Sequence, residues 1–389
     1  MAEKTTMPVH IRRDGFDPDP GLAELRRECP VSRVDLVTGG SGWLVTRYDD
    51  ARAVLGDPDR FPSHPNAFIA QDTESPAGPP PGFLLSYNPP EHTRLRRMLA
   101  PAFTAKRMRR LRPRVEEMVS DQLDAIERAG APADLVPMFT LPIPSLAICE
   151  LLGVPYADRA AFQDRSVRRT DFAASLEQRA AAFAETQAYL AELVAAQRAT
   201  PGDDILGMLV REHGDTLSDP ELTGVADLLL IAGHDTTAHM LALGILLLLN
   251  HPGHVAKIHD EATIEEMLRY LSVVHSGIPR VARENAVLGG QLIEAGDWVV
   301  CSLPSANRDE TLGPEPGRFD PDRRIPGHIA FGHGIHHCLG APLARMELGI
   351  AYPALFRRFP DLRLAVPPED VRFHSHSVVY GVESLPVAW

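Results

Sequence analysis

The longest regular pattern along the chain is an apolar segment over residues 220–250. It begins at the sequence SDPE (218–221), where cap residues precede a proline and an acid in the first turn. It ends at HPG (251–253), which does not continue a helix. The pattern predicts a helix over residues 220–250, about 46 Å long at the usual rise per residue. Because its second half is apolar on every side, we expect this helix to be buried.

Other helical patterns are shorter. Apolar residues three and four positions apart predict helices over residues 114–129 and 179–198. Similar but briefer patterns predict helices over residues 49–55 and 262–271. Prolines precede the next apolar run, so we expect its helix to be short and to cover only residues 146–152.

Strand-like patterns lie towards both ends of the chain. Alternating and aromatic residues predict a strand over residues 42–48. Further strands are expected over residues 277–282, 287–293 and 298–303, and a β-hairpin over residues 371–389. The chain is therefore predicted to be mainly α with a smaller β region.

The chain has 389 residues and 44% hydrophobic residues, which is enough to form a large core. No Ser/Gly-rich linker or low-complexity run divides it, so we expect a single domain over residues 1–389. Residues 62–90 are rich in Pro, Gly, Ser and Asn. A loop of this length is often a lid or a binding loop, although a plain surface loop is an equally good interpretation.

Charge is unevenly distributed. The net charge of −13 argues against nucleic-acid binding, but residues 92–114 contain nine Lys and Arg and no Asp or Glu. This stretch is either a solvated helix face or a docking surface for an acidic partner. The first residues lack the apolar core of a signal peptide, and the longest apolar run, residues 240–249, is too short to cross a membrane. We therefore expect a soluble cytoplasmic protein that does not bind membranes and has reduced thiols.

The strongest candidate for chemistry is the sequence FGHGIHHCLG (331–340), a Gly-rich turn with a cysteine ahead of a helical pattern. The N–H groups at a helix start favour a thiolate at Cys338, which could be a metal ligand or a nucleophile. A structural zinc site needs about four ligands, and Cys29, Cys149 and Cys301 are scattered. A nucleophilic cysteine needs a base and an oxyanion hole, and the sequence of this turn carries the signature of neither. An axial thiolate to haem iron needs only one protein ligand.

A second candidate lies inside the predicted long helix, which reads AGHDTT over residues 232–237. A glycine, a carboxylate and two threonines weaken a buried helix locally, and such an inconsistency often marks a functional site. The plain alternative is that Thr236 and Thr237 donate hydrogen bonds back to their own helix.

These segments resemble the motifs of one family. The pattern Phe331-Gly-x-Gly-x-His-x-Cys-x-Gly resembles the haem-binding signature of cytochrome P450 monooxygenases. The AGHDTT segment resembles the oxygen-activation segment of that family, and Glu266-x-x-Arg269 resembles its E-x-x-R pair. Arg318 resembles the arginine that joins this pair, and PEHTRLRR (90–97) resembles the start of the haem-contacting helix.

The resemblance implies a cytochrome P450 fold that binds haem b between the long helix and the cysteine turn, with Cys338 as axial iron ligand. The other implied cofactor-binding residues are His92, Arg96, Ala232, Gly233, Arg280, Phe331, Gly332, His336 and Gly340. The four cations among them (His92, Arg96, Arg280 and His336) would meet the haem propionates. The resemblance makes Asp235 and Thr236 the catalytic residues that deliver protons, and Glu266, Arg269 and Arg318 a buried structural group. His234 and His337 receive no role.

The implied activity inserts one oxygen atom from O2 into an apolar small molecule, as in hydroxylation of a natural product in secondary metabolism. The chain has no G-x-G-x-x-G fingerprint, so ferredoxin and ferredoxin reductase would supply electrons as separate proteins to a monomer. Segments 68–85, 168–183, 273–278 and 374–380 are expected to contact the substrate. Oxidative coupling or peroxide-driven oxidation is an alternative outcome. A haem-based sensor and a metal-binding structural protein are hypotheses of a different class.

Overall fold

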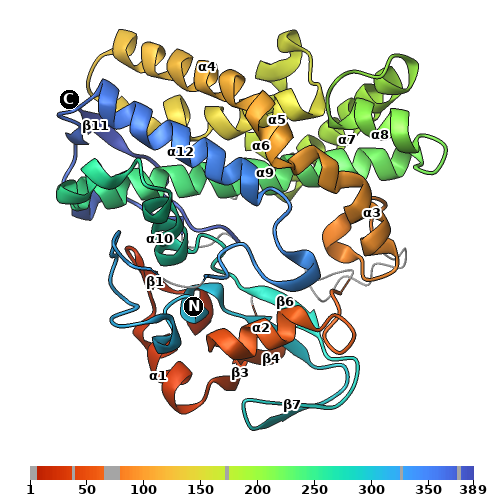
Figure 1. Cartoon of the computed structure of the whole chain (residues 1–389), viewed down its shortest axis with the longest axis vertical. Coiled ribbons are helices and arrows are strands. Elements are labelled where there is room, and N and C mark those ends of the chain that lie inside the picture. The colour runs from red at the N-terminus through yellow and green to blue at the C-terminus, as the bar shows by residue number, and fades with distance from the viewer. Residues whose placement is uncertain (1–6, 37–39, 65–78, 171–174, 325–326, 375–377) are drawn as a thin grey trace. The chain divides into compact units, whose positions relative to one another are not determined.

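The fold is that of a computed structural model, which describes residues 7–36, 40–64, 79–170, 175–324, 327–374 and 378–389. Helices make up most of the regular structure and the sheets are small, which confirms the predicted class (Figure 1). The chain forms two compact units, each built from segments far apart in the sequence. The first unit comprises Met1–Gly78, Ala242–Ala341 and Val366–Leu385, and the second comprises Pro79–Leu241, Pro342–Ala365 and Pro386–Trp389. The single domain over residues 1–389 stays a prediction.

A four-stranded sheet organises the first unit. Its order is β3 (Val31–Asp35), β4 (Ser41–Val45), β9 (Trp298–Cys301) and β6 (Ile278–Val281). The outer pairs are antiparallel, while β4 and β9 run parallel although more than 250 positions separate them. The strands predicted at 42–48, 277–282 and 298–303 are thereby confirmed with different ends: β4 begins one residue earlier and ends three earlier, β6 is one residue shorter at each end, and β9 ends two residues earlier.

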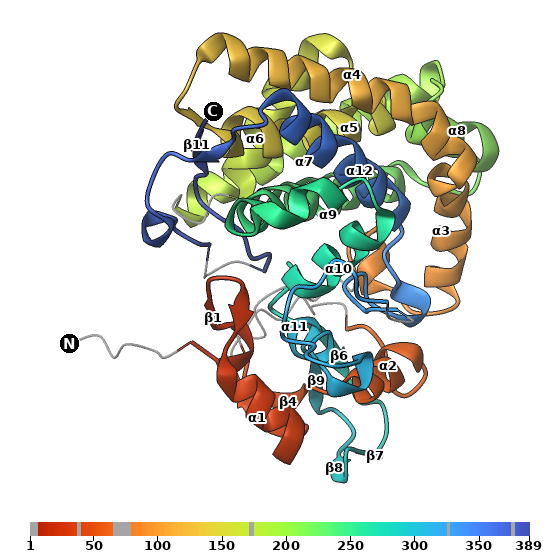
Figure 2. The same ribbon diagram turned by 60° about the vertical axis from the view of Figure 1, so that its left-hand side comes forward.

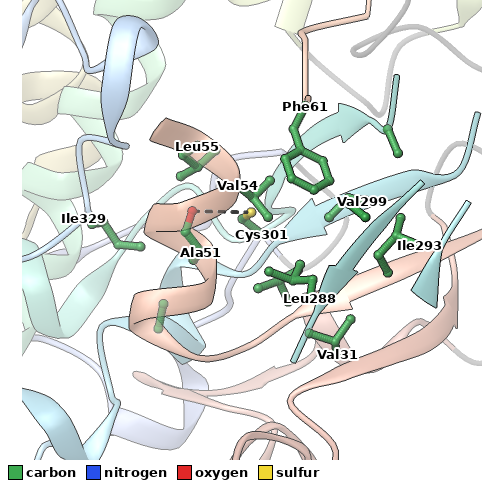
Figure 3. Close-up of a cluster of buried hydrophobic side chains, with 14 of the residues drawn as sticks. Val31, Ala51, Val54, Leu55, Phe61, Leu288, Ile293, Val299, Cys301 and Ile329 are labelled. Carbon is green, nitrogen blue, oxygen red and sulfur yellow. Dashed lines mark hydrogen bonds between the residues drawn. The ribbon is translucent and has the colours of Figure 1, made fainter. Parts of the chain in front are cut away.

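Helix α2 (Tyr48–Gly56) packs its apolar side on this sheet and confirms the helix predicted at 49–55. Figure 3 shows the buried cluster between them, in which the Cys301 thiol lies 4.0 Å from the carbonyl oxygen of Ala51. Ile329, which precedes the cysteine turn, belongs to the same cluster. The core of the first unit therefore holds the chain just before the candidate site.

The remaining elements of the first unit are short. They are β1 (Arg13–Asp14), β2 (Asp17–Pro18), α1 (Pro20–Glu28), α10 (Glu261–Leu271), β7 (Ala286–Leu288), β8 (Gln291–Ile293) and α11 (Leu303–Ala306). The single strand predicted over 287–293 is wrong: β7 and β8 form a hairpin, which Figure 2 shows clearly. Gly289 and Gly290 make its turn with φ of +54° and +80°, values that side chains rarely allow.

Helices dominate the second unit. They are α3 (Glu91–Leu99), α4 (Ala105–Ala129), α5 (Pro142–Leu152), α6 (Arg159–Thr170), α7 (Leu176–Ala199), α8 (Ile205–His213) and α12 (Ala341–Arg358, from its second residue). The prediction of a short helix over 146–152 is wrong, because α5 begins four residues earlier. Pro142 and Pro144 lie in its first turn, where a missing N–H removes no helical hydrogen bond.

The long helix α9 (Asp219–Asn250) confirms the helix predicted over 220–250. A capping box fixes its start: Ser218 N donates to Glu221 Oε2 at 3.0 Å and Glu221 N donates to Ser218 Oγ at 3.3 Å. Helix α12 lies alongside α9, and Tyr352 Oη donates to the carbonyl oxygen of Met240 at 2.5 Å (Figure 1). In the part of the chain that is described, α9 alone is long and apolar enough to cross a membrane. Its most apolar stretch is 61% buried, as in a core helix.

The C-terminal residues form only the inner part of the expected hairpin over 371–389, in which His374 N donates to the carbonyl oxygen of Gly381 and Glu383 N to that of Arg372, each at 2.9 Å. Phe373 and Val382 form an isolated antiparallel bridge. Strand β11 (Pro386–Ala388) instead joins β10 (Arg363–Leu364) and β5 (Ala133–Asp134) in a three-stranded sheet. The expected tip of the hairpin, residues 375–377, lies outside the described residues.

Candidate functional site

The cysteine turn has a backbone that only glycine permits. Gly332 and Gly334 have φ of +73° and +71°. A Cβ on Gly334 would lie 2.2 Å from the carbonyl oxygen of Leu55 in α2, so no side chain fits there. Cys338 N donates to the carbonyl oxygen of Phe331 at 2.8 Å and closes the turn. The glycines therefore let the turn pack against α2 while it presents Cys338 at the start of α12.

Cys338 is the cysteine that the fold leaves accessible. Cys149 and Cys301 are buried, and burial raises the pKa of each thiol to about 12. Cys29 is half-buried and its thiol lies 3.7 Å from the carbonyl oxygen of Val31. Cys338 is exposed, and even a Cβ on Gly340 would lie 3.9 Å from its sulfur. Among the four cysteines, the structure thus leaves the Cys338 sulfur exposed to a ligand.

Glu266 and Arg269 form the buried pair that the sequence predicts. Arg269 Nε and Nη2 donate to the two carboxylate oxygens of Glu266, each at 2.7 Å, on α10. Both side chains are almost completely buried. A bidentate pair of this kind is strong and directional, but it depends on having every polar atom satisfied.

The third member of this group is Arg323, and the assignment of Arg318 is wrong. The Arg318 side chain is 63% exposed and faces Glu315 and Asp320. Arg323 Nε donates to Glu266 Oε1 at 3.2 Å, and the Arg323 side chain is only 5% exposed. Arg318 takes part through its backbone, whose carbonyl oxygen accepts from Arg269 Nη2 at 3.2 Å. A second guanidinium therefore contacts Glu266, through its Nε, from further along the irregular segment.

The buried group also holds the chain that leads into the cysteine turn. Arg269 Nη1 donates to the carbonyl oxygens of Asn307 and Pro316, each at 2.7 Å. Asn307 is itself buried, and its Oδ1 accepts from Ile329 N at 2.8 Å. Its Nδ2 donates to Ser272 Oγ at 2.8 Å. An unbroken set of hydrogen bonds thus runs from α10 to within two residues of Phe331.

Arg280 is a buried cation beside the cysteine turn. It lies on β6 two residues after Ile278, whose Cδ1 would be 3.5 Å from a Cβ on Gly332. Its side chain is buried, which lowers the pKa of the guanidinium. Nη1 donates to the carbonyl oxygen of Pro279 at 2.8 Å, and none of the described carboxylates lies within 4.0 Å. A buried guanidinium without a carboxylate suits an anionic ligand. His336 lies half-buried in the turn itself.

In the second unit, His92 and Arg96 lie one turn apart on the same face of α3. His92 is buried and Arg96 is half-buried. Arg94 points elsewhere and forms an ion pair with Glu221 at the start of α9. Arg97 is exposed, as a solvated residue should be.

The middle of α9 combines packing with exposure. Thr236 Oγ1 donates to the carbonyl oxygen of Ala232 at 2.8 Å, which is the plain alternative named for this hydroxyl. A Cβ on Gly233 would lie 2.5 Å from Ile148 Cδ1, so the glycine lets α9 approach α5. Ala232 is nevertheless exposed, although most of this apolar helix is buried. Packing explains Gly233 but does not explain the uncovered face at Ala232.

His234 and Asp235 are neighbours in the same turn. His234 is buried, and burial lowers the pKa of its imidazole to about 4. Its Nε2 lies 3.7 Å from Asp235 Oδ1, beyond hydrogen-bond distance. Asp235 is half-buried. His234 is therefore neutral at neutral pH and leaves Asp235 as the carboxylate of this segment.

Comparison with known proteins identifies the family. The family model "Cytochrome P450" matches residues 186–262 and 261–372. Cytochrome P450 FAS1 of Rhodococcoides fascians is 44% identical over the whole of both chains. Cytochrome P450-SU2 of Streptomyces griseolus is 45% identical over 96% of this chain and 94% of its own. The chain belongs to the cytochrome P450 family. It is a cytochrome P450 monooxygenase.

Solved structures confirm the cytochrome P450 fold. P450 StaH from the biosynthesis of the glycopeptide antibiotic A47934 superposes with a TM-score of 0.90, at 45% identity over 99% of this chain and 100% of that one. CYP105P1 in complex with filipin I gives a TM-score of 0.89, at 40% identity over 97% of both chains. The relatives are bacterial P450s.

P450 enzymes bind haem b through a cysteine ligand, and the residues present here fit that cofactor. The turn presents one exposed thiol on a glycine-rich backbone. The buried Arg280 offers a positive charge of the kind that a propionate needs. On α9, Ala232 is exposed and has a small apolar side chain, as a contact with a flat ring requires.

The structure groups the predicted residues in two sets, one in each unit. In the first unit, β6 carries Arg280 and α10 carries Glu266 and Arg269, while the cysteine turn itself carries Phe331, Gly332, His336, Cys338 and Gly340. In the second unit, α3 and one turn of α9 carry the residues His92, Arg96, Ala232, Gly233, Asp235 and Thr236. Sequence reasoning missed Arg323 and Asn307. The only signal for Arg323 was a second arginine soon after Arg318, and Asn307 gave no signal.

Proposed function

We propose that this P450 binds haem through Cys338 and inserts one oxygen atom from O2 into an apolar natural product. The observation that carries the proposal is the exposed Cys338 on a glycine turn, in a chain that belongs to the P450 family. Arg280, His336, His92 and Arg96 are the cations that would bind the haem propionates. Bound haem supplies the activation of O2, and the chain's residues supply binding, orientation and protons.

Asp235 and Thr236 move the protons. The Thr236 hydroxyl donates its proton to the carbonyl oxygen of Ala232, so its own oxygen lone pairs can accept a further hydrogen bond. Half-buried Asp235 is close enough to solvent to be reprotonated during turnover. Loss of the Asp235 carboxylate should slow proton delivery, whereas loss of the Thr236 hydroxyl should divert electrons from product to hydrogen peroxide.

Electrons come from ferredoxin and ferredoxin reductase in the cytoplasm, with this protein acting as a monomer. P450 enzymes use redox partners, and the basic stretch 92–114 supplies a docking surface for an acidic one. Several of its arginines are already paired: Arg110 with Asp203, Arg112 with Glu116 and Arg114 with Glu117. The remaining exposed cations are Arg97, Lys106 and Arg109, which have no carboxylate within 4.0 Å among the described residues.

The experiment that tests this function uses the purified holoenzyme. With CO and dithionite, the wild type should show the red-shifted Soret band of thiolate ligation, and Cys338→Ala should lose it. Cys29→Ala is the matched control and should keep the band. A Cys338→Ala variant with an unchanged band would refute the ligand assignment. Thr236→Ala should consume electrons from ferredoxin with less product and more hydrogen peroxide, and unchanged coupling would refute its role.

Oxidative coupling is the second candidate outcome. It is supported by the similarity to P450 StaH from glycopeptide antibiotic biosynthesis and to OxyB from teicoplanin biosynthesis, solved in a complex with an X-domain. The two outcomes differ in product mass, because insertion adds one oxygen atom while coupling removes two hydrogen atoms. Compounds that shift the haem iron from low to high spin should be incubated with ferredoxin, its reductase and O2, and in parallel with peroxide. The mass of the product then shows whether insertion or coupling has occurred. The incubation that yields product shows whether the oxidant is O2 or peroxide.

A further inference from the structure

A small N-terminal ribbon, residues 13–18, contacts parts of the first unit that are distant from it in the sequence. Strands β1 and β2 pair antiparallel, with Arg13 opposite Pro18 and Asp14 opposite Asp17. Gly15 makes the turn with a φ of +56°. A two-stranded ribbon this short is not stable alone, so its tertiary contacts must hold it in place.

Arg13 makes the main contacts of the ribbon. Its Nη1 donates to the carbonyl oxygen of Leu271 at 2.8 Å, and Nη2 donates to that of Ser272 at 3.1 Å. The same guanidinium stacks over the Tyr380 ring, 4.7 Å from its centroid. Tyr380 Oη in turn donates to the carbonyl oxygen of Gly15 at 2.7 Å. One arginine thus joins the end of α10 to a residue near the C-terminus.

Tyr380 is buried and connects two segments, which we call the inner segment (residues 273–278) and the C-terminal segment (residues 371–374 and 378–382). Its N–H donates to the carbonyl oxygen of Val273 at 2.8 Å, and Val274 pairs with Val379 in a β-bridge. Its ring stacks on Phe373 at 5.5 Å and 9°, and contacts the His275 ring at 5.3 Å. The position of Tyr380 therefore fixes both segments at once.

A second arginine anchors the ribbon to the same helix end. Arg308 Nη1 donates to Asp17 Oδ1 at 2.9 Å, and Nη2 donates to the carbonyl oxygen of Tyr270 at 3.2 Å. Its guanidinium lies 4.0 Å from the Tyr270 ring centroid. Ser272 leaves α10 with a φ of +41°, a conformation that costs a serine energy and needs outside support. The bond from Arg13 to the Ser272 carbonyl oxygen provides that support.

We propose that Arg13 and Tyr380 form a clamp that positions the inner and C-terminal segments and thereby sets which ligands the enzyme accepts. The inference rests on the proposed function and on the expectation from the sequence that residues 273–278 and 374–380 contact the substrate, of which residues 375–377 lie outside the described residues. Neither segment contains a helix or a long strand, apart from the first residue of β6 in the inner segment. Their shape therefore depends on the two isolated bridges, Val274–Val379 and Phe373–Val382, on the stack at Phe373 and on the arginine above Tyr380. Arg13 acts through Tyr380 and is a positioning residue.

Two azole probes separate positioning from general damage. Imidazole is small and senses only access to the iron, whereas econazole binds the iron through the same type of nitrogen and also carries bulky aromatic rings. Titrations of the purified holoenzyme, followed by the Soret shift, give a Kd for each. In Arg13→Ala we expect econazole to bind roughly threefold to thirtyfold more weakly, the range of remote positioning effects, with imidazole unchanged.

Arg33→Ala is the matched control. Arg33 also stacks on an aromatic ring, at 4.4 Å from Trp43, and pairs with Asp297, but its contacts among the described residues do not reach either segment. Its substitution should leave both Kd values unchanged. Tyr380→Phe keeps the ring and loses only the bond to Gly15, and it gives a second variant if Arg13→Ala fails to fold. Arg13→Lys keeps the charge without the forked donor pair, and it should restore part of the econazole affinity.

An unchanged econazole Kd in both Arg13→Ala and Tyr380→Phe would overturn the clamp. Equal weakening of imidazole and econazole would also overturn it, because that result indicates damage to the iron site rather than altered selectivity. A wild type that binds neither azole and shows no thiolate Soret band would instead refute the proposed function. The two hypotheses therefore fail in different measurements.

Discussion

Glu347 is a buried acid in the apolar helix α12, and replacing it should change how stability depends on pH. Its neighbours Met346 and Leu348 are buried as well. No described residue gives its Oε2 a hydrogen bond. Burial alone raises the pKa of the carboxyl from 4.5 to about 8, because no charged group contributes. The folded protein therefore keeps a proton on Glu347 at neutral pH, whereas the unfolded chain releases it.

The sign and size of the effect follow from this difference. The folded-state pKa is raised, so the contribution of Glu347 to stability is fully present below pH 4.5 and is lost as the pH rises towards 8. Each pH unit inside this window costs about 1.4 kcal/mol, so about 4 kcal/mol is lost between pH 5 and pH 8. Glu347→Gln carries a neutral side chain of the same shape and cannot ionise. Relative to the wild type, it should gain about this much stability over the same interval.

Urea unfolding of the holoenzyme at pH 5, 6.5 and 8, followed by circular dichroism, measures the difference. Using the change in ΔΔG between these pH values cancels any constant cost of placing an amide at this position. Glu369→Gln, at an exposed carboxylate, is the control and should show the same pH dependence as the wild type. A ΔΔG for Glu347→Gln that stays flat from pH 5 to 8 would show that the acid is ionised in the folded protein.

Two further predictions concern the chain around Cys338. Arg323→Met leaves the Glu266 carboxylate buried without one of its partners and should cost about 3–5 kcal/mol and lower haem content, whereas exposed Arg318→Ala should change stability by less than about 0.5 kcal/mol. Urea unfolding and haem content of the two variants decide this, and equal effects would refute the corrected assignment. Gly334→Ala forces a Cβ within 2.2 Å of the Leu55 carbonyl oxygen and should weaken the thiolate Soret band. Gly349→Ala on α12, where nothing lies within 4 Å of the new Cβ, should instead stabilise by about 0.5–1 kcal/mol.

The sequence predicts those features best that depend on local geometry. The start of α9 was predictable because SDPE encodes a capping box, which the structure forms between Ser218 and Glu221. The Glu266–Arg269 pair was predictable because residues three apart on a helix face each other. The third arginine was not predictable in this way. Arg318 and Arg323 both lie in irregular chain, where spacing does not fix the direction of a side chain, and only tertiary packing selects Arg323.

The segment AGHDTT shows how a functional and a packing requirement can share the same residues. Its break in the apolar pattern pointed to function, yet Gly233 is also required by the close approach of Ile148, and the Thr236 hydroxyl is satisfied by Ala232. Either residue alone would therefore be explained without any ligand. Ala232 is different, because a core helix gains nothing from leaving one alanine exposed among buried leucines. The exposed face at Ala232, rather than the glycine or the threonine, is what distinguishes a ligand-binding helix from a well-packed one.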